Sequence, residues 1–321
     1  MTRYFLLSAA FALSWCCGAV AAENWPSRPL HVIVPFGAGT TTDIVPRIVF
    51  EQVSDQLRQP VIVENRPGAG ATTGSAAVAK AEADGYTVLV NSSAHTIAPS
   101  LYPRLDYDPV RDLLAIVPLG TVPSVLLASK VKGLNSVADL VRAAKDRPGL
   151  LNFASAGTGT ATHLSAVRSN ASAGIEAVHI PFKSAPEILG EMLAGRIDYF
   201  LAPIAVALPF AQDGKLSALA VNTPQRLEAL PNVPTLAEAG FANAEYSFWI
   251  GVFLPSKTPT PVVERLAQET RKALAAPKVR EKLAALGVEP MDTSPGHFAT
   301  VVARQFGTDA ELVRAAGLKP Q

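Results

Sequence analysis

Cysteine is almost absent from this sequence: its 321 residues include only two, Cys16 and Cys17, both near the N-terminus. We expect residues 1–22 to be a cleavable secretory signal, because a short positive start is followed by an apolar core and by small residues at positions 19–22. The mature chain would then contain no cysteine. It could form no disulfide bond, no cysteine-ligated zinc site and no thiol nucleophile, so its stability must come from a large core.

Long apolar runs are also lacking. The run from Tyr4 to Cys17 breaks at Gly18, short of the ~20 apolar residues that a membrane-spanning helix needs, which argues against a membrane anchor. A lipoprotein is a further alternative, but Trp15 is too bulky for the position before a lipidated cysteine. We therefore expect a secreted protein that is free in the periplasm.

An excess of charge of either sign is missing as well. Lysine and arginine number 28 against 27 aspartates and glutamates, for a formal net charge of +1. No basic field would attract nucleic acid, and no acidic tail is present. The charge balance therefore argues against a nucleic-acid partner and does not identify another.

The motifs of common enzyme classes are not found. The sequence has no Gly-x-Ser-x-Gly, no His-Glu-x-x-His and no Gly-Lys-Ser/Thr of a P-loop, and its five histidines never reach metal-ligand spacing. We expect no metal, no cofactor and no catalytic residues. Ser93 and His95 could act as nucleophile and base, but no third group that would orient the histidine is identifiable. A secreted serine hydrolase therefore remains an alternative that only the Ser93 and His95 pair supports.

What the sequence does contain is a regular alternation of strand-like and helix-like stretches. Residues 30–34 are a β-branched run, and residues 43–57 and 185–193 read as helices, with apolar side chains three and four positions apart. Such alternation predicts an α/β fold with parallel sheets covered by helices. The length favours two domains.

The C-terminal helices carry no glycine-rich loop and look like scaffolding that returns to the first sheet. The first domain is therefore expected to be discontinuous. The expected limits are residues 23–122 plus 249–321 for domain 1 and residues 123–248 for domain 2.

Two loops are the candidate binding elements. Residues 36–43 (Phe-Gly-Ala-Gly-Thr-Thr-Thr-Asp) join a strand to the start of a helix that Asp43 is expected to cap, and residues 154–160 repeat this theme in the second half. Unpaired N–H groups and the positive end of a helix dipole meet at such points, so an anion is the natural guest. A nucleotide fits poorly, because the first loop lacks the third glycine of the dinucleotide pattern. His95 and His163 lie beside these hydroxyl-rich stretches and are candidates for ligand contact rather than catalysis.

A series of motifs runs through the chain from Trp25 onward. They include Pro35-Phe36-x-Ala38-Gly39-x-x-Thr42-Asp43, Val63-Glu64-Asn65-Arg66-Pro67-Gly68-Ala69-Gly70, Ala83-Asp84-Gly85-Tyr86-Thr87, Asn152-Phe153-Ala154-Ser155-Ala156-Gly157, Val178-His179-Ile180-Pro181-Phe182-Lys183 and Leu230-Pro231-x-Val233-Pro234-Thr235. In this order they resemble the substrate-binding proteins of tripartite tricarboxylate transporters, the Bug family. The resemblance implies a periplasmic-binding-protein-like (Venus flytrap) fold, with two α/β domains around a ligand cleft.

The resemblance also implies how a small carboxylate would be held, mainly by backbone amides and hydroxyl groups. The implied ligand-binding residues are Gly39, Thr40, Thr41, Ser92, Ser93, His95 and Thr96 in the first domain, and Ser155, Gly157, Thr158, Gly159, Thr160, Lys183, Ser184, Ala185 and Ala202 in the second. The sequence departs from the family pattern in two places. Thr40 and Thr41 stand where members often have glycines, and Ala202 stands where they often have aspartate. The missing carboxylate would disfavour an amino group on the ligand and favour a plain or aromatic carboxylate.

We therefore expect a periplasmic solute-binding protein that captures a dicarboxylate, tricarboxylate or aromatic carboxylate for uptake by a tripartite tricarboxylate transporter. Its partners would be that ligand and the membrane subunits of the transporter, and the protein would act as a monomer. A ligand-binding co-receptor for a membrane signalling sensor is the alternative. Sequence alone does not separate the two, because either partner would recognise the closed lobes.

Overall fold

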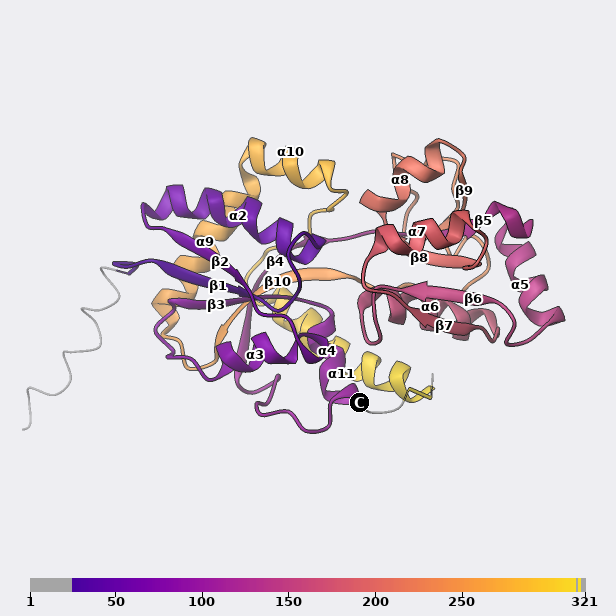
Figure 1. The fold of residues 1–321 in the computed structure, drawn as a ribbon. Helices are drawn as coiled ribbons and strands as arrows, with labels where there is room; N and C mark the ends of the chain where they lie inside the picture. The colour runs from indigo at the N-terminus through magenta and orange to yellow at the C-terminus, as the bar shows by residue number, and fades with distance from the viewer. Residues whose placement is uncertain (1–24, 316, 319–321) are drawn as a thin grey trace, which may run out of the picture.

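The computed structural model describes residues 25–315 and 317–318 of the chain. They form two α/β lobes that lie side by side, each built on its own five-stranded sheet (Figure 1). The expected signal, residues 1–22, lies outside the described residues. Within the described part of the chain, no helix is both long and apolar enough to cross a membrane.

The first lobe is organised around a sheet with the strand order β2-β1-β3-β10-β4. Strands β1, β2 and β3 run parallel, whereas β10 is antiparallel to both β3 and β4. Most of these strands are rich in apolar, often β-branched residues, as expected for a sheet that is covered on both faces. Their bounds are β1 (Leu30–Val34), β2 (Val61–Asn65), β3 (Thr87–Ser92), β4 (Leu113–Thr121) and β10 (Trp249–Pro255).

Helices cover both faces of this sheet because successive side chains of a strand point to opposite sides. Val32 and Val88 contribute to the core beneath α2, α9 and α10, whereas Ile33 and Leu89 contribute to the core beneath α3 and α11. The bounds are α2 (Thr41–Leu57), the short 3-10 helix η1 (Ala69–Ala71), α3 (Thr72–Ala79), α4 (Ala94–Leu101), α9 (Thr260–Ala275), α10 (Pro277–Ala285) and α11 (His297–Ala315).

The second lobe repeats this plan with the strand order β7-β6-β8-β5-β9. One apolar cluster packs α7 and α8 on one face of the sheet, and a second packs α5 and α6 on the other. The strands are β5 (Ser124–Ser129), β6 (Asn152–Ser155), β7 (Val178–Pro181), β8 (Tyr199–Pro203) and β9 (Leu216–Val221). The helices are η2 (Lys130–Lys132), α5 (Val137–Asp146), α6 (Ala161–Ala173), α7 (Ala185–Leu193) and α8 (Ile204–Gln212).

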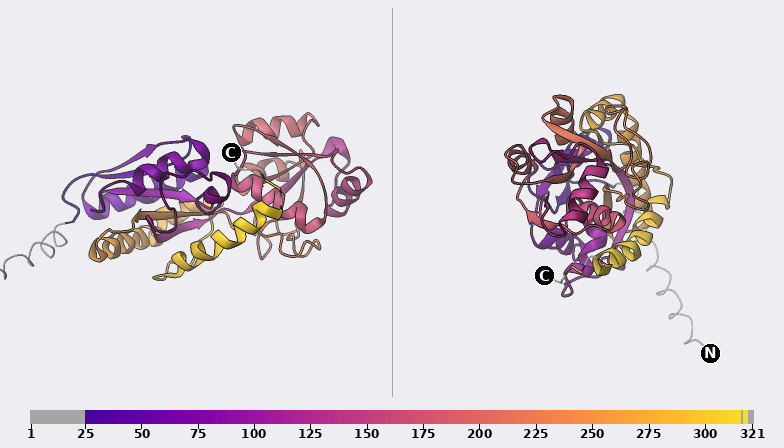
Figure 2. Two further views of the ribbon diagram at one scale, coloured as in Figure 1. Left: turned by 90° about the horizontal axis from the view of Figure 1, so that it is seen from below. Right: turned by 90° about the vertical axis from the view of Figure 1, so that its right-hand side faces the viewer.

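Two short segments connect the lobes. The first leads from Thr121 at the end of β4 to Ser124 at the start of β5, and the second returns through Tyr246 to Trp249 at the start of β10. Helix α11 forms a further link, because it extends from the first lobe toward the second (Figure 2, left). The apolar cluster that the lobes share consists of Ile97, Leu101, Ala161, Leu164, Tyr246, Leu312 and Val313.

The carboxyl ends of the parallel strands point toward these connections in both lobes. In the first lobe, Ile250 pairs with Ser92 at the end of β3, one residue after the connecting segment. In the second, Ser124 pairs with Pro203 at the end of β8. The loops that follow β1, β3, β6 and β7 therefore lie at facing edges of the two sheets, which is where open α/β folds bind ligands.

Candidate functional site

The loop between β1 and α2 forms the first-lobe side of the site. Gly39 adopts φ +81°, a conformation that a glycine accepts without strain, and turns the chain into the helix. Thr40 is the N-cap residue, but its hydroxyl donates to the carbonyl of Gly37 at 2.9 Å instead of capping the helix. The first turn of α2 therefore keeps backbone N–H groups available for an anion.

The loop between β6 and α6 has the same construction in the second lobe. Gly159 adopts φ +77°, and the hydroxyl of Thr160, the N-cap residue, donates to the carbonyl of Gly157 at 2.7 Å. Ser155 adds a further contact, because its hydroxyl oxygen accepts the N–H of Gly157 at 3.1 Å.

The sequences of the two loops share one pattern, Gly-x-Gly-Thr-x-Thr, which starts at Gly37 in the first and at Gly157 in the second. The backbone of the N-cap residue is nearly identical, with φ −74° and ψ 158° at Thr40 and φ −76° and ψ 162° at Thr160. Each lobe thus presents a helix N-terminus behind a glycine turn, and each can donate N–H groups to an anionic group.

The two loops differ in the side chain that holds them from behind. In the first, the carboxylate of Asp43 accepts the N–H of Gly39 at 2.8 Å, and it also accepts from Asn65 and Arg47. Burial opposes ionisation of Asp43, but the hydrogen bonds from Arg47, Gly39 and Asn65 together lower its pKa below the ordinary value. Asp43 is therefore an ionised anchor of the turn.

In the second loop the same position is held by a histidine. Nδ1 of His163 accepts the N–H of Gly159 at 3.1 Å, and the His163 ring stacks on His179 with 3.9 Å between centroids. Nε2 of His179 lies 2.6 Å from the hydroxyl oxygen of Ser155. Burial and the neighbouring His179 lower the pKa of His163 to about 3, and burial lowers that of His179 to about 4. Both rings are therefore neutral near pH 7.

The hydroxyl-rich stretch after β3 is deeply buried. Ser92, Ser93, His95 and Thr96 are each at most 2% exposed. The ring of His95 packs against two phenylalanine rings, with centroid distances of 4.7 Å and 5.5 Å, and the hydroxyl of Thr96 donates to Asp309 on α11. In this conformation the four side chains are shielded from solvent, although their backbone lies at the facing edge of the sheet.

The remaining second-lobe candidates divide in two. Lys183 and Ser184 are exposed before α7, and Ala185 begins that helix, so all three remain accessible at the facing edge. Ala202 is 0% exposed and belongs to the apolar core of the lobe. The structure thus places Ala202 behind the surface of the lobe rather than on it.

The lobes already touch beside these loops. A Cβ atom added at Gly159 would lie 2.6 Å from a methyl carbon of Leu101 on α4, so the second loop packs directly against the first lobe. Only a residue without a side chain permits this approach. The contact places the loop before α6 directly against the C-terminal end of α4 in the first lobe.

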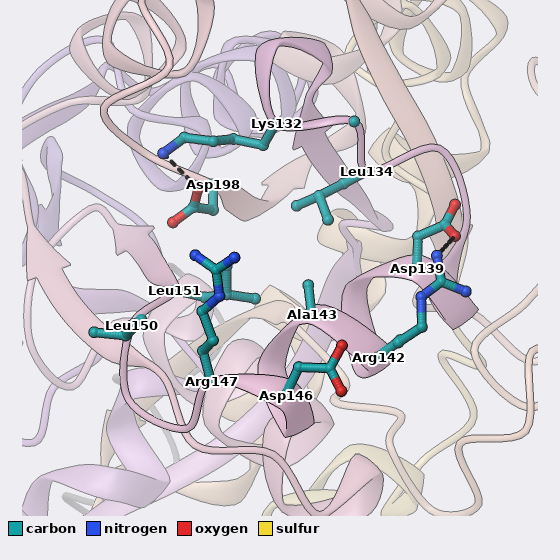
Figure 3. Close-up of a pocket in the computed structure, with 11 residues that line it drawn as sticks. Lys132, Leu134, Asp139, Arg142, Ala143, Asp146, Arg147, Leu150, Leu151 and Asp198 are labelled. Carbon is teal, nitrogen blue, oxygen red and sulfur yellow. Dashed lines mark hydrogen bonds and ion pairs between the residues drawn. The ribbon is translucent and has the colours of Figure 1, made fainter.

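A cavity of about 380 Å³ elsewhere in the second lobe involves none of the candidate residues. It lies at the opposite edge of the sheet, where Asp198 precedes β8 and Lys132 follows β5 (Figure 3). The Asp198 carboxylate accepts the N–H of Asn152 at 2.7 Å and lies 3.4 Å from the Lys132 ammonium group. The Asp198 carboxylate thus pairs with the backbone N–H at the start of β6 and with a lysine side chain, which is a structural role. Among the described residues, no group of three or more histidine, aspartate or glutamate side chains could hold a metal ion.

Comparison with known proteins places the chain in a family. The family model described as "Tripartite tricarboxylate transporter family receptor" matches residues 45–318. The chain belongs to this family. A related protein from Pseudomonas sp. strain P51, encoded in the tcbD-tcbE intergenic region, is 37% identical over 94% of this chain and 90% of its own length. BugT of Bordetella pertussis is 33% identical over 99% of each chain.

Solved structures of receptor relatives share the whole fold. A Rhodopseudomonas palustris protein with adipate has a TM-score of 0.83 and 30% identity, covering 92% of this chain and 100% of its own. MatC of the same organism, with bound malate, has a TM-score of 0.80 and 31% identity, covering 90% and 100%. These matches confirm the expected two-domain, periplasmic-binding-protein-like fold and a binding protein rather than an enzyme.

Two of the residues behind the loops, Asp43 and His179, are not assigned to the candidate site by the sequence. Asp43 was expected to cap its helix, yet it holds the turn at Gly39, and His179 was not assigned to the site at all. The spacing could have indicated the role of Asp43 and of His163, because each follows by four positions the glycine whose N–H it accepts.

Proposed function

We propose that this chain captures a small organic carboxylate between its two lobes and delivers it to the membrane subunits of a tripartite tricarboxylate transporter. The observation that carries the proposal is the matched pair of glycine-threonine loops, one on each lobe. Helix α2 has no side-chain cap, and in α6 the Thr160 hydroxyl accepts only the N–H of His163, at 3.4 Å, so the first N–H groups of both helices remain available to a ligand. Neutral N–H and hydroxyl donors can satisfy a carboxylate without a buried cation, which permits release when the lobes separate.

The family relatives support this choice of ligand. Two of the solved structures that share the fold contain adipate and malate, both dicarboxylates. For the present chain, the proposed contacts come from Gly39, Thr40 and Thr41 in the first lobe, and from Ser92, Ser93, His95 and Thr96, which this conformation shields from solvent. In the second lobe they come from Ser155, Gly157, Thr158, Gly159, Thr160, Lys183, Ser184 and Ala185.

The cellular setting is part of the same proposal. Cleavage of residues 1–22 would release the mature protein into the periplasm as a monomer, with domain 1 formed by residues 23–122 and 249–321 and domain 2 by residues 123–248. Relatives described as periplasmic support this location. The membrane subunits would recognise the lobes once they have closed on the ligand.

A thermal-shift panel tests the ligand class. The signal-free protein is unfolded and refolded to remove carried-over ligand, and dicarboxylates, tricarboxylates, aromatic carboxylates and acidic amino acids are then compared. Ligand at about 100 times its Kd adds ~2.7 kcal/mol to the stability of the folded protein. A carboxylate that raises Tm selectively supports the proposal, whereas a flat panel with verified refolding contradicts the ligand class.

A single substitution tests the placement. Thr40→Glu puts a carboxylate at the N-terminus of α2, where it favours the helix but repels an incoming anion, so we expect a folded protein without measurable carboxylate affinity in calorimetry. Thr300→Glu is the matched control, because Thr300 is exposed in the first turn of α11 and its hydroxyl also bonds a backbone carbonyl, that of Gly296. Retained affinity in folded Thr40→Glu protein would rule out this placement.

A further inference from the structure

We propose that His163 is a positioning residue of the binding site, which holds the second-lobe loop in its ligand-binding shape as an uncharged hydrogen-bond acceptor. The inference rests on the proposed function, because that function places the ligand at this loop. It assigns His163 a role through the backbone of Gly159 rather than through contact with the ligand.

The first argument is the internal match between the lobes. Asp43 and His163 stand at the same place in the two Gly-x-Gly-Thr-x-Thr loops, and each accepts the N–H of the second glycine, at 2.8 Å and 3.1 Å. In both loops this contact satisfies the N–H of the second glycine and fixes the turn that leads into the helix.

The second argument is what surrounds each acceptor. The charge of Asp43 is balanced by Arg47 one helical turn later, at 2.9 Å. The residue one turn after His163 is Val167, which offers no counter-charge. The first lobe therefore uses an ion pair at this position, whereas the second uses a neutral acceptor with no ion-pair partner beside it.

The third argument is the protonation state that the geometry requires. Nδ1 can accept the N–H of Gly159 only if it carries no proton, so His163 must be the neutral tautomer with hydrogen on Nε2. The stacked ring of His179, at 3.9 Å and 20°, leaves the pair no favourable way to hold two positive charges. Both rings are neutral near pH 7, as described above.

The other titratable groups around the pair do not alter this state. Tyr199 on β8 bonds Asn170 through its hydroxyl, and Lys183 and Glu187 beyond β7 are exposed. On α11, the carboxylate of Asp309 is engaged with Thr96. None of these groups contributes to the lowered pKa of His163, which stems from burial and from His179.

Two substitutions separate the acceptor from the imidazole. His163→Asn keeps an acceptor oxygen near the place of Nδ1 and cannot titrate, whereas His163→Leu fills the site without an acceptor. Calorimetry with malate and with adipate measures the affinity at pH 7. We expect His163→Asn to bind within about threefold of the unaltered protein and His163→Leu to bind roughly tenfold more weakly or worse, since a buried N–H is left unsatisfied.

A pH profile separates positioning from direct recognition. A neutral positioning residue predicts the same pH profile of affinity from pH 8 to pH 5 in the unaltered protein and in His163→Asn, because any change near pH 5 then comes from the second carboxyl group of the probe. If affinity instead rises on acidification in the unaltered protein and not in His163→Asn, a protonated His163 binds the carboxylate directly. That result would overturn the inference, and so would unaltered affinity in folded His163→Leu.

Controls keep this test apart from failure of the proposed function. Tyr199→Phe removes a buried hydrogen bond from the same aromatic stack without touching the loop, so its Tm should fall while its affinity stays unchanged. If the unaltered protein binds neither probe, malate and adipate are not its ligands, and ¹⁵N NMR of the ligand-free protein then tests the role of His163. We expect the spectra to show the proton of His163 on Nε2. We also expect the Gly159 amide signal to shift more in His163→Leu than in His163→Asn. A proton on Nδ1 would contradict it.

Discussion

At the scale of single residues, the first-lobe loop depends on Asp43. Its carboxylate is nearly inaccessible to solvent and accepts hydrogen bonds from the N–H of Gly39, the amide of Asn65 and the guanidinium of Arg47. Asn65 also donates to the carbonyl of Phe36. One ionised side chain thus connects the turn, the helix and the neighbouring strand β2, and it fixes the position of the N–H groups that would meet a ligand.

Asp43→Asn tests this network. The amide nitrogen of asparagine would face donors instead of accepting from them, so at least one buried donor loses its partner. We expect a loss of ~1–3 kcal/mol in the free energy of unfolding and weaker carboxylate binding, measured by urea denaturation and calorimetry. Asp213→Asn is the control, because Asp213 pairs with Lys215 on the open surface and such pairs contribute ~0–1 kcal/mol. Equal losses in the two variants would show that the Asp43 network adds nothing.

The sequence predicts those site residues whose conformation depends only on their neighbours in the chain. The glycines and threonines of both loops are predictable, because left-handed turns favour glycine and helix starts favour threonine for local reasons. The inward orientation of Thr96 is not, since it depends on Asp309, which lies 213 positions away in the sequence. The same holds for His95, whose ring packs on Phe253 and on Phe306 of α11.

At the scale of elements, periodicity decides what can be predicted. Helix α7 has the predicted bounds, Ala185–Leu193, because its apolar residues recur at helical spacing. Helices α4 and α8 are not indicated by the sequence, since both are short and contain a proline, Pro99 and Pro209. These two helices are stabilised by packing, which for α4 is chiefly against α11. Such contacts join residues far apart in the chain, so the local sequence does not indicate them.

The contact between β10 and α11 is also set by packing. Gly251 lies within β10, and a Cβ atom at this position would clash with the ring of Phe298 on α11. The close approach lets the Phe298 ring reach Trp249 and Phe253, at centroid distances of 5.1 Å and 5.6 Å. Glycine in the middle of this strand is therefore required by the helix that crosses it.

Gly251→Ala should lower the free energy of unfolding by ~1–3 kcal/mol, because the buried ring has to move out of a packed core. Gly307→Ala on α11 is the matched control and should have the opposite sign. Gly307 is exposed, and nothing lies within 4 Å of its added Cβ, so the alanine should stabilise the helix by ~0.5–1 kcal/mol. Denaturation midpoints measure both, and a stable Gly251→Ala protein would contradict the packing argument.

At the scale of the whole molecule, neutral buried histidines occur in both lobes. Burial lowers the pKa of His95 in the first lobe to about 4, and in the second lobe His179 has a pKa of about 4 and His163 about 3. Asp309 on α11 behaves in the opposite way, since burial raises its pKa to about 7. It lies where the lobes meet, and the hydrogen bond from Thr96 and the charge of Arg168 on α6 partly counteract the rise. Folding therefore lowers the pKa of three histidines, in both lobes, and raises the pKa of one aspartate between the lobes.

These shifts predict how stability depends on pH. Between about pH 4.5 and 6, unfolding lets three histidines bind protons that the folded protein excludes, while Asp309 gives up one, so unfolding takes up at most about two protons. The free energy of unfolding should then fall by up to ~2.7 kcal/mol for each pH unit of acidification in this window, and level off above pH 7. Urea midpoints followed by tryptophan fluorescence at pH 7, 6 and 5 measure the slope. His95→Gln should make the slope shallower by about one proton and Asp309→Asn steeper by about one. A midpoint that does not change between pH 7 and pH 5 would mean that the histidines titrate in the folded protein as they do in water.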